Sequence, residues 1–118
     1  MKPRTEEDLM WLGTDLDKTI ADNTGHPEYL LTKPMPGARE ALIKLESRGF
    51  KIIIYTARPW NDYEKIENFM LYHDLPFRRI ICGKPLFFRV IDDRNIEFDG
   101  DWDKVLKKLD ILEKELEK

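Results

Sequence analysis

Three consecutive isoleucines, in the run KIIIY at Lys51–Tyr55, constrain the fold of this chain more than any other feature of its sequence. A strand with one face in solvent alternates apolar and polar residues, so an uninterrupted apolar run predicts a strand buried on both faces, as in a parallel sheet. A helix is predicted just before it, over residues 37–48, because apolar residues recur there at helical spacing and Gly49 follows where a left-handed cap would end it. The chain is therefore expected to join helices to the strands of a parallel sheet.

Short apolar runs and amphipathic helices continue to alternate along the rest of the chain. Helices are predicted over Asp62–His73 and about Asp101–Lys118, each with apolar residues on one stripe. The breaker-rich stretch Asp22–Pro36 predicts an irregular loop with a short hairpin or flap at Tyr29–Leu31. This alternation predicts one domain over residues 1–118, with an α/β three-layer, Rossmann-like fold and a mainly parallel sheet. Further strands are predicted at Leu9–Gly13, Arg79–Cys82 and Phe88–Ile91, with a small edge strand at Ile96–Phe98.

Charge and cysteine content narrow the class of protein. The chain has 23 acidic and 20 basic residues and a formal charge of -3, so it has no overall positive field to attract nucleic acid, which could bind only by a local contact. The single cysteine, Cys82, forms no intramolecular disulfide, and no charged-then-apolar leader opens the chain. Its apolar runs are far shorter than the ~20 residues of a membrane-spanning helix. We therefore expect a cytoplasmic protein without a membrane segment.

Polar side chains follow four of the predicted strands at the point where each strand ends. Asp15 and Asp17 follow the first, Thr56 follows KIIIY, Lys84 follows RRIICG, and the pair Asp92–Asp93 follows FRVI. In open parallel sheets, ligands bind beyond the carboxyl ends of the strands. Carboxylates gathered there would repel one another unless a cation lies between them, and oxygen ligands without matching His or Cys favour Mg²⁺ over zinc. The sequence thus predicts a magnesium site suited to phosphate chemistry.

The same residues form four motifs that resemble a known family. The segments DLDKT from Asp15, IIIYTAR ending in Thr56 and Arg58, GKP around Lys84, and VIDD ending in Asp92 and Asp93 resemble, in order, the motifs of the haloacid dehalogenase (HAD) superfamily of phosphohydrolases. Four motifs in order, each after an apolar strand, are far more specific than any one of them. The resemblance spans about Leu9 to Asp93 and implies a HAD-like fold.

The resemblance implies a role for each residue of the first two motifs. Asp15 would be the nucleophile that forms an aspartyl-phosphate, and its other oxygen would bind Mg²⁺. Asp17 would protonate the leaving oxygen and then activate water, while its backbone carbonyl reaches the metal. Thr56 would donate a hydrogen bond to the transferring phosphoryl group. With aspartate at position 17, a phosphatase or phosphotransferase is favoured over a dehalogenase.

The last two motifs would supply charge and the remaining metal ligands. Lys84 would neutralise charge on the phosphoryl group and on Asp15. Asp93 would be the direct metal ligand and Asp92 would bind through water, although the reverse order is also open. However, Lys84 and Asp92 are only eight positions apart, whereas a parallel crossover usually takes a dozen or more residues. Either the third strand is very short, or Lys84 is not the motif lysine.

Two features bear on the substrate. Lys18 stands where many members of the family have glycine, which could alter the flap or bring a charge near the substrate, and Arg58 is a second candidate for substrate binding. The 36 residues from Ile20 to Tyr55 already contain a helix and a strand, so the chain is expected to be capless. An open site fits a bulky substrate, a neighbouring subunit acting as lid in a homo-oligomer, or loose selectivity.

The leading hypothesis is therefore a Mg²⁺-dependent phosphatase for a phosphomonoester, with a small phosphorylated molecule as the expected substrate. A phosphatase for nucleic-acid ends or for phosphoprotein is an alternative suggested by the missing cap. A non-catalytic module that binds a phosphorylated ligand or a metal is an alternative of another class. The pair Asp15 and Asp17 argues against such a module, because binding alone needs neither a nucleophile nor an acid/base.

Overall fold

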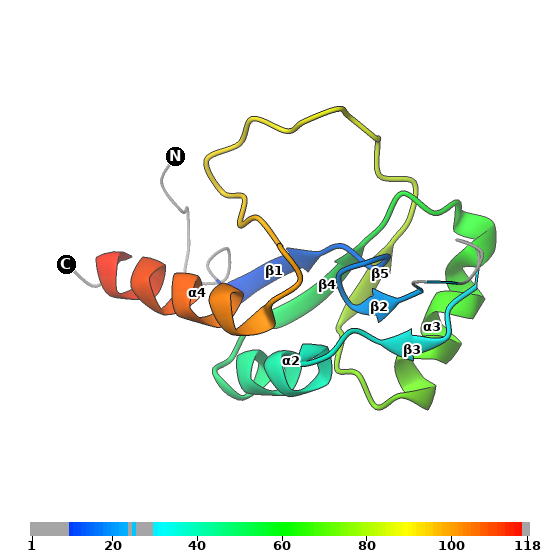
Figure 1. Cartoon of the computed structure of the whole chain (residues 1–118), viewed down its shortest axis with the longest axis horizontal. Helices are drawn as coiled ribbons and strands as arrows, with labels where there is room; N and C mark the ends of the chain where they lie inside the picture. Colours follow the sequence, from blue (N-terminus) through cyan, green and yellow to red (C-terminus); the bar gives the residue numbers. More distant parts are fainter. Residues whose placement is uncertain (1–9, 24, 26–29, 117–118) are drawn as a thin grey trace.

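The computed structural model describes residues 10–23, 25 and 30–116 (Figure 1). These residues form an α/β structure around a three-stranded parallel sheet with the strand order β1-β4-β5. The strands are β1 (Trp11–Thr14), β4 (Lys51–Tyr55) and β5 (Arg79–Ile81). The predicted bounds of β4 are confirmed, and the strand predicted at Arg79–Cys82 is present but ends one residue earlier. Of the strand predicted at Leu9–Gly13, Leu9 lies outside the described residues, and the strand is found at Trp11–Thr14. The α/β class and the parallel sheet were thus predicted correctly.

β4 is the central strand, which explains its isoleucines. It pairs in parallel with β1 through Leu12↔Ile52 and with β5 through Ile54↔Ile80. Because successive side chains of a strand point to opposite faces, Ile52 and Ile54 share one face while Ile53 lies on the other. Ile52 and Ile54 belong to the main core, and Ile53 is 7% exposed on the opposite face. An apolar residue is therefore buried at each of these three positions.

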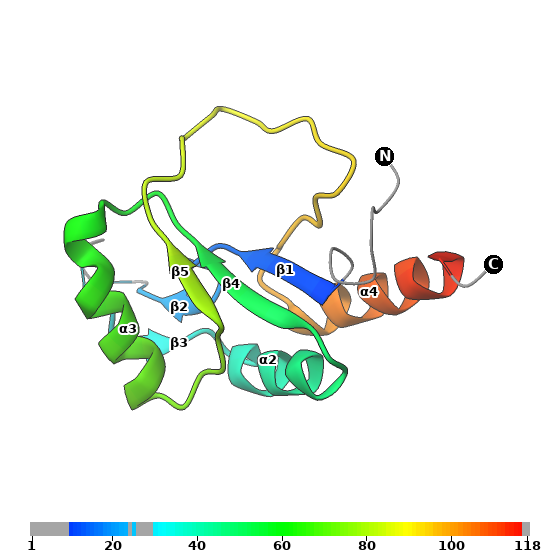
Figure 2. The same ribbon diagram turned by 180° about the vertical axis from the view of Figure 1, so that it is seen from behind.

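Three α-helices pack against the sheet: α2 (Ala38–Ser47), α3 (Tyr63–Tyr72) and α4 (Trp102–Leu116). A 3₁₀ turn, η1 (Trp60–Asp62), leads into α3. All three helices contribute side chains to the core cluster that contains Ile52 and Ile54. α2 and α4 lie side by side, and α3 lies beside β5 (Figures 1 and 2). The helices predicted over 37–48, 62–73 and 101–118 are thus present, with slightly shorter described bounds.

The second face of the sheet is only partly covered. On it, the cations of Lys51 and Arg79 lie 5.0 and 5.6 Å from the ring centroid of Trp11. Tyr55, on the same face at the end of β4, is 42% exposed. No helix among the described residues covers this face, so the third layer that we expected is absent from that part of the chain.

The stretch predicted as an irregular loop, Asp22–Pro36, contains part of a small ribbon. Strands β2 (Ala21–Asp22) and β3 (Lys33–Pro34) pair antiparallel, and the amide of Met35 donates to the carbonyl of Ile20 at 2.6 Å. The hairpin or flap expected at Tyr29–Leu31 lies partly outside the described residues, which include Leu30 and Leu31 but not Tyr29. The ribbon lies between β1 and α2 in the chain.

The predicted strands Phe88–Ile91 and Ile96–Phe98 are absent. The segment between β5 and α4 instead arches away from the sheet, and Phe88 and Ile91 are 88% and 103% exposed (Figure 1). The length of the connection explains this. To form a parallel strand beside the outer edge of β1, the chain would have to pass from the end of β5 across three strand spacings and back to the level at which the strands begin. The straight-line distance between these two points is about 19 Å. The amide of Lys84 already donates to the carbonyl of Thr56, so only three residues, which span about 14 Å with their flanking bonds, remain before Phe88.

β1 is consequently paired only with β4 in the part of the chain that the structure describes. Beside its outer edge, α4 packs on α2 and carries a buried Trp102 and Leu109. None of the helices seen in the described ranges is long and apolar enough to cross a membrane.

Candidate active site

The turn after β1 places Asp15 and Asp17 at the carboxyl edge of the sheet. Leu16 and Ile20 are fully buried and anchor the turn in the core. The amides of Ile20 and Ala21 both donate to the carbonyl of Leu16, at 2.9 and 2.8 Å. Leu16 is buried between Asp15 and Asp17, so the side chains of the two aspartates are left less buried, at the site.

Asp15 forms an ion pair with Lys84. The Nζ atom of Lys84 lies 3.3 Å from Oδ1 of Asp15, and the two side chains are 25% and 45% exposed. The ammonium group also lies 5.4 Å from the ring centroid of Tyr55, at the end of β4. The structure therefore brings together the first and third motifs, as the sequence predicts, in a position open to a ligand.

Thr56 holds the second and third motifs together from within the protein. Its side chain is 1% exposed, its amide donates to the carbonyl of Ile81 at 3.0 Å, and its carbonyl accepts from the amide of Lys84 at 2.9 Å. Its Oγ1 accepts a hydrogen bond from the amide of Arg58 at 3.2 Å. Thr56 thus fixes the chain on both sides of the site edge.

Asp17 lies in a network of hydrogen bonds with Arg58 at its centre. Nε and NH2 of Arg58 donate to Oδ2 and Oδ1 of Asp17, each at 2.9 Å, and Nδ2 of Asn23 donates to Oδ1 of Asp17 at 3.0 Å. NH1 of Arg58 donates to Asp62 at 3.1 Å. The hydrogen bond to Asp17, offset in part by desolvation, raises the pKa of the Arg58 guanidinium above its usual value. The guanidinium is therefore charged at every working pH.

Sequence reasoning missed two residues of this network, Asn23 and Asp62. Asp62 lies four residues after Arg58, at the spacing of an ion pair across one helical turn, so this spacing could have indicated it. Asn23 lies in the breaker-rich stretch and carries no comparable signal. Its place beside Asp17 follows from the turn after β1.

Asp92 and Asp93 are not brought to Asp15 and Asp17. Both are exposed, and Oδ1 of Asp92 accepts a hydrogen bond from the amide of Arg94 at 2.8 Å, as in an ordinary turn. Among the residues that the structure describes, no group of three or more His, Cys, Asp or Glu side chains could hold a metal ion. The expected convergence of four strand ends is thus wrong for the fourth, because the strand that should carry this pair is absent.

Lys18 is exposed and has a backbone φ of 63°, in the left-handed region. Its amide donates to the carbonyl of Ala21 at 2.8 Å, which closes the turn. Glycine adopts this conformation without steric cost, whereas a residue with a Cβ does so at a cost. This conformation explains why glycine suits the position in the motif that DLDKT resembles.

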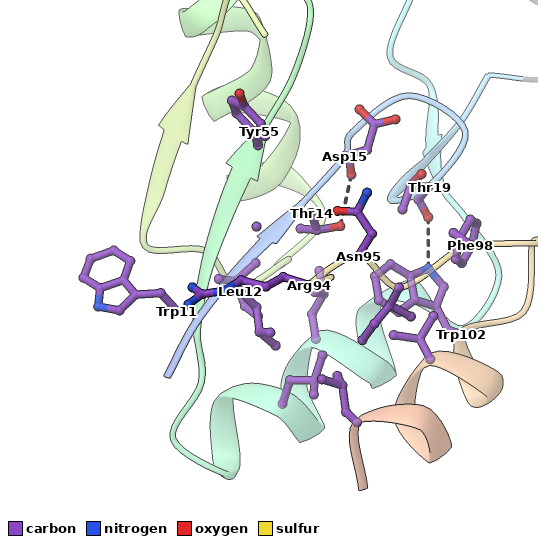
Figure 3. A pocket seen from close by; sticks show the side chains of 17 residues that line it. Trp11, Leu12, Thr14, Asp15, Thr19, Tyr55, Arg94, Asn95, Phe98 and Trp102 are labelled. Carbon is purple, nitrogen blue, oxygen red and sulfur yellow. Dashed lines mark hydrogen bonds between the residues drawn. The ribbon is translucent and has the colours of Figure 1, made fainter. Parts of the chain in front are cut away.

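A cavity of about 620 Å³ lies beside the outer edge of β1 and extends to Asp15 (Figure 3). Its floor is apolar and its rim includes Arg94 and Asn95, which come from the segment before α4. Close by, Nε1 of Trp102 donates to the carbonyl of Thr19 at 2.9 Å and so ties α4 to the turn after β1. The apolar residues that line the cavity are Trp11, Leu12, Leu42, Leu45, Ile52, Ile96, Phe98, Trp102, Val105 and Leu109.

Comparison with known proteins gives one informative result. No family model matches the chain, and no curated protein matches it. A crystal structure of a protein from Vibrio cholerae, described as an MCSG target, is similar with a TM-score of 0.61 and 25% sequence identity. The match covers 83% of this chain and 97% of the other. The fold is thus shared with a solved protein over most of both chains, and that protein's description gives no activity.

Proposed function

We propose that this protein is a Mg²⁺-dependent phosphatase that hydrolyses a phosphomonoester through an aspartyl-phosphate on Asp15. The observation that carries the proposal is the ion pair of 3.3 Å between Asp15 and Lys84 at the carboxyl edge of a parallel sheet. Asp17 and Thr56 lie at the same edge, and this set matches the first three motifs of the HAD superfamily in their order. Family membership, a Rossmann-like sheet and a capless domain are parts of this proposal.

In the first step, a carboxylate oxygen of Asp15 attacks phosphorus and the bond from phosphorus to the leaving oxygen breaks. Lys84 balances the negative charge that the phosphoryl group brings to Asp15. Asp17 gives its proton to the leaving oxygen. In the second step, Asp17 takes a proton from water, the water oxygen attacks phosphorus, and the bond to Asp15 breaks to release phosphate.

Oxygen donors at the site fit a magnesium ion in part. Mg²⁺ typically takes one or two carboxylates, with water and substrate phosphate completing its shell. Asp15, 45% exposed, and the backbone carbonyl of Asp17 would supply two ligands, and Asp93 or Asp92 a third if their segment moves toward β1. The ion would supply positive charge that stabilises the phosphoryl group during transfer.

The substrate that we propose is a small phosphorylated molecule, and the protein would act in the cytoplasm. The exposure of Asp15 also leaves room for a larger substrate, such as a nucleic-acid end or a phosphoprotein. The net charge of -3 weighs against nucleic acid. A panel of phosphorylated metabolites, sugars, nucleotides and oligonucleotide ends, ranked by kcat/KM, would distinguish these classes.

The test of the activity is hydrolysis of p-nitrophenyl phosphate with and without Mg²⁺. We expect turnover that EDTA abolishes and that Mg²⁺ restores, and loss of at least 10³-fold, an order-of-magnitude estimate, in Asp15→Asn. Asp110→Asn, on the exposed face of α4, is the matched control and should keep full activity. Full activity in Asp15→Asn would disprove the proposal.

A binding module would bind phosphate without forming a covalent intermediate. Beryllium fluoride with Mg²⁺ mimics an aspartyl-phosphate, so a phosphatase should bind it stoichiometrically through Asp15, as measured by ¹⁹F NMR. A signal that survives unchanged in Asp15→Asn, or no bound signal at all in the unmodified protein, would favour the module.

A further inference from the structure

Arg58 is the most deeply buried charged side chain of the candidate site. Its side chain is 8% exposed, compared with 32% for Asp17 and 20% for Asp62. All three of its nitrogen atoms donate to carboxylates: Nε and NH2 to Asp17 and NH1 to Asp62. Arginine presents its donors in a rigid planar fork, so two parallel bonds to one carboxylate fix both the position and the plane of that carboxylate.

This geometry argues against the substrate-binding role that the sequence suggests for Arg58. A phosphate that took the fork of Arg58 would have to displace Asp17 and break two hydrogen bonds of 2.9 Å. Lys84, 25% exposed and beside Asp15, is the better placed cation for a phosphate. The fork of Arg58 therefore serves a partner inside the protein.

The backbone of Arg58 is fixed as firmly as its side chain. Its amide donates to Oγ1 of Thr56 at 3.2 Å, and its carbonyl accepts from the amide of Gly83 at 2.8 Å. The guanidinium is thus attached to the chain segments that hold Thr56 and Lys84. A carboxylate held by this fork has a defined place relative to both.

We propose that Arg58 is a positioning residue that holds the carboxyl group of Asp17 in place for proton transfer to the leaving oxygen, and that Asp62 keeps Arg58 in that orientation. The inference rests on the proposed function, in which Asp17 is the proton donor. A lysine cannot replace Arg58 in this role, because an ammonium is a point charge without the planar fork. Asn23 provides a third hydrogen bond to Asp17, from its Nδ2 to Oδ1 at 3.0 Å.

The test compares substrates with different needs for a proton donor. A dinitrophenolate leaves without protonation, whereas an alkoxide does not, so only an alkyl phosphate depends on the placement of Asp17. The measured quantity is kcat/KM, which reports the steps up to phosphoryl transfer to Asp15 and excludes the later hydrolysis. For Arg58→Lys we expect kcat/KM to fall about 30-fold or more for an alkyl phosphate, within the range of general acid catalysis, and about threefold or less for 2,4-dinitrophenyl phosphate.

Asp62→Asn gives a second, milder test, because it keeps the fork on Asp17 and removes only the negative charge of the group that accepts from NH1. It should produce the same preference for the better leaving group with a smaller loss. Arg48→Lys is the matched control, since Arg48 is also paired with two carboxylates, Asp110 and Glu113, but lies at the C-terminal end of α2, just before β4 begins and so at the end of the sheet away from the site. It should change neither rate.

Each other outcome contradicts the proposal in a recognisable way. An equal loss for both substrates in Arg58→Lys and Asp62→Asn would assign Arg58 to substrate binding or to structure alone. Unchanged rates for both would show that Asp17 needs no such support. An unmodified protein that hydrolyses neither substrate would instead overturn the proposed function, and the inference with it.

Discussion

Thr56 is the residue where stability and activity can be separated most sharply. Its hydroxyl is buried and accepts a hydrogen bond from the amide of Arg58 at 3.2 Å, and the resemblance to the HAD motifs implies that the same hydroxyl donates to the phosphoryl group. Thr56→Val removes the hydroxyl at nearly constant volume. Thr56→Ser keeps the hydroxyl and removes a methyl group, so it is the matched control.

For Thr56→Val, the amide of Arg58 loses its acceptor, at a cost of about 1–3 kcal/mol, and the added methyl group recovers about 0.8 kcal/mol. The net loss of unfolding free energy is therefore about 0.2–2.2 kcal/mol, or up to roughly 10 °C in Tm for a chain of this size. The lost hydrogen bond to a charged phosphoryl group, worth about 1.5–3 kcal/mol, lowers kcat/KM by about 10- to 100-fold.

Thermal unfolding followed by circular dichroism measures the first quantity, and Mg²⁺-dependent hydrolysis at a temperature where both variants are folded measures the second. Thr56→Ser should lose about 1 kcal/mol from the missing methyl group but keep most of its activity. If Thr56→Val and Thr56→Ser have equal kcat/KM, the hydroxyl has no part in catalysis. If Thr56→Val unfolds at the same temperature as the unmodified protein, the buried hydrogen bond contributes nothing.

Three further predictions concern the turn, the thiol and the aspartate pair. Lys18→Gly should leave the free energy of unfolding unchanged or raise it by up to about 1 kcal/mol in urea titration, since φ is 63°, and Lys18→Val should lower it; a loss in Lys18→Gly would contradict the role of backbone strain. Burial raises the pKa of the Cys82 thiol, so its thiolate forms only at higher pH. Ellman's reagent should therefore react with Cys82 slowly at pH 8 until urea unfolds the chain. Fast reaction in the folded protein would show that the thiol is accessible to solvent. Asp93→Asn should raise the Mg²⁺ concentration for half-maximal hydrolysis about tenfold or more, and an unchanged Mg²⁺ dependence would remove Asp93 from the metal site.

Elements defined by local patterns could be predicted from the sequence. β4 is found at Lys51–Tyr55 as predicted, and α2 begins and ends within one residue of the expected helix over 37–48. In both cases the signal is local, since burial periodicity and the glycine after α2 are properties of neighbouring residues. The strand predicted at Phe88–Ile91 has an equally apolar sequence, but its formation depends on whether a short connection can reach the sheet edge.

The candidate site likewise has contacts that could be predicted from the sequence and contacts that could not. The ion pair of Asp15 with Lys84 could be expected from the sequence. Each residue follows a predicted strand, and the carboxyl ends of parallel strands lie at one edge of a sheet. The partner of Arg58 does not follow from that rule, because an arginine near several carboxylates can reach more than one of them. Only the path of the chain from Thr56 to Asp62 decides that its fork meets Asp17.

The outer edge of β1 and the exposed run from Leu86 to Ile91 have a consequence for handling this protein in solution. An unpaired strand edge and an unpaired apolar run on one molecule complement those of a second molecule, because backbone groups on an exposed edge can pair with another chain. Pairing of this kind is reciprocal between two copies and grows with concentration. Because the cavity beside Asp15 borders the same edge, a second copy paired there would cover it, and size-exclusion chromatography across the working range of concentration would detect such pairs.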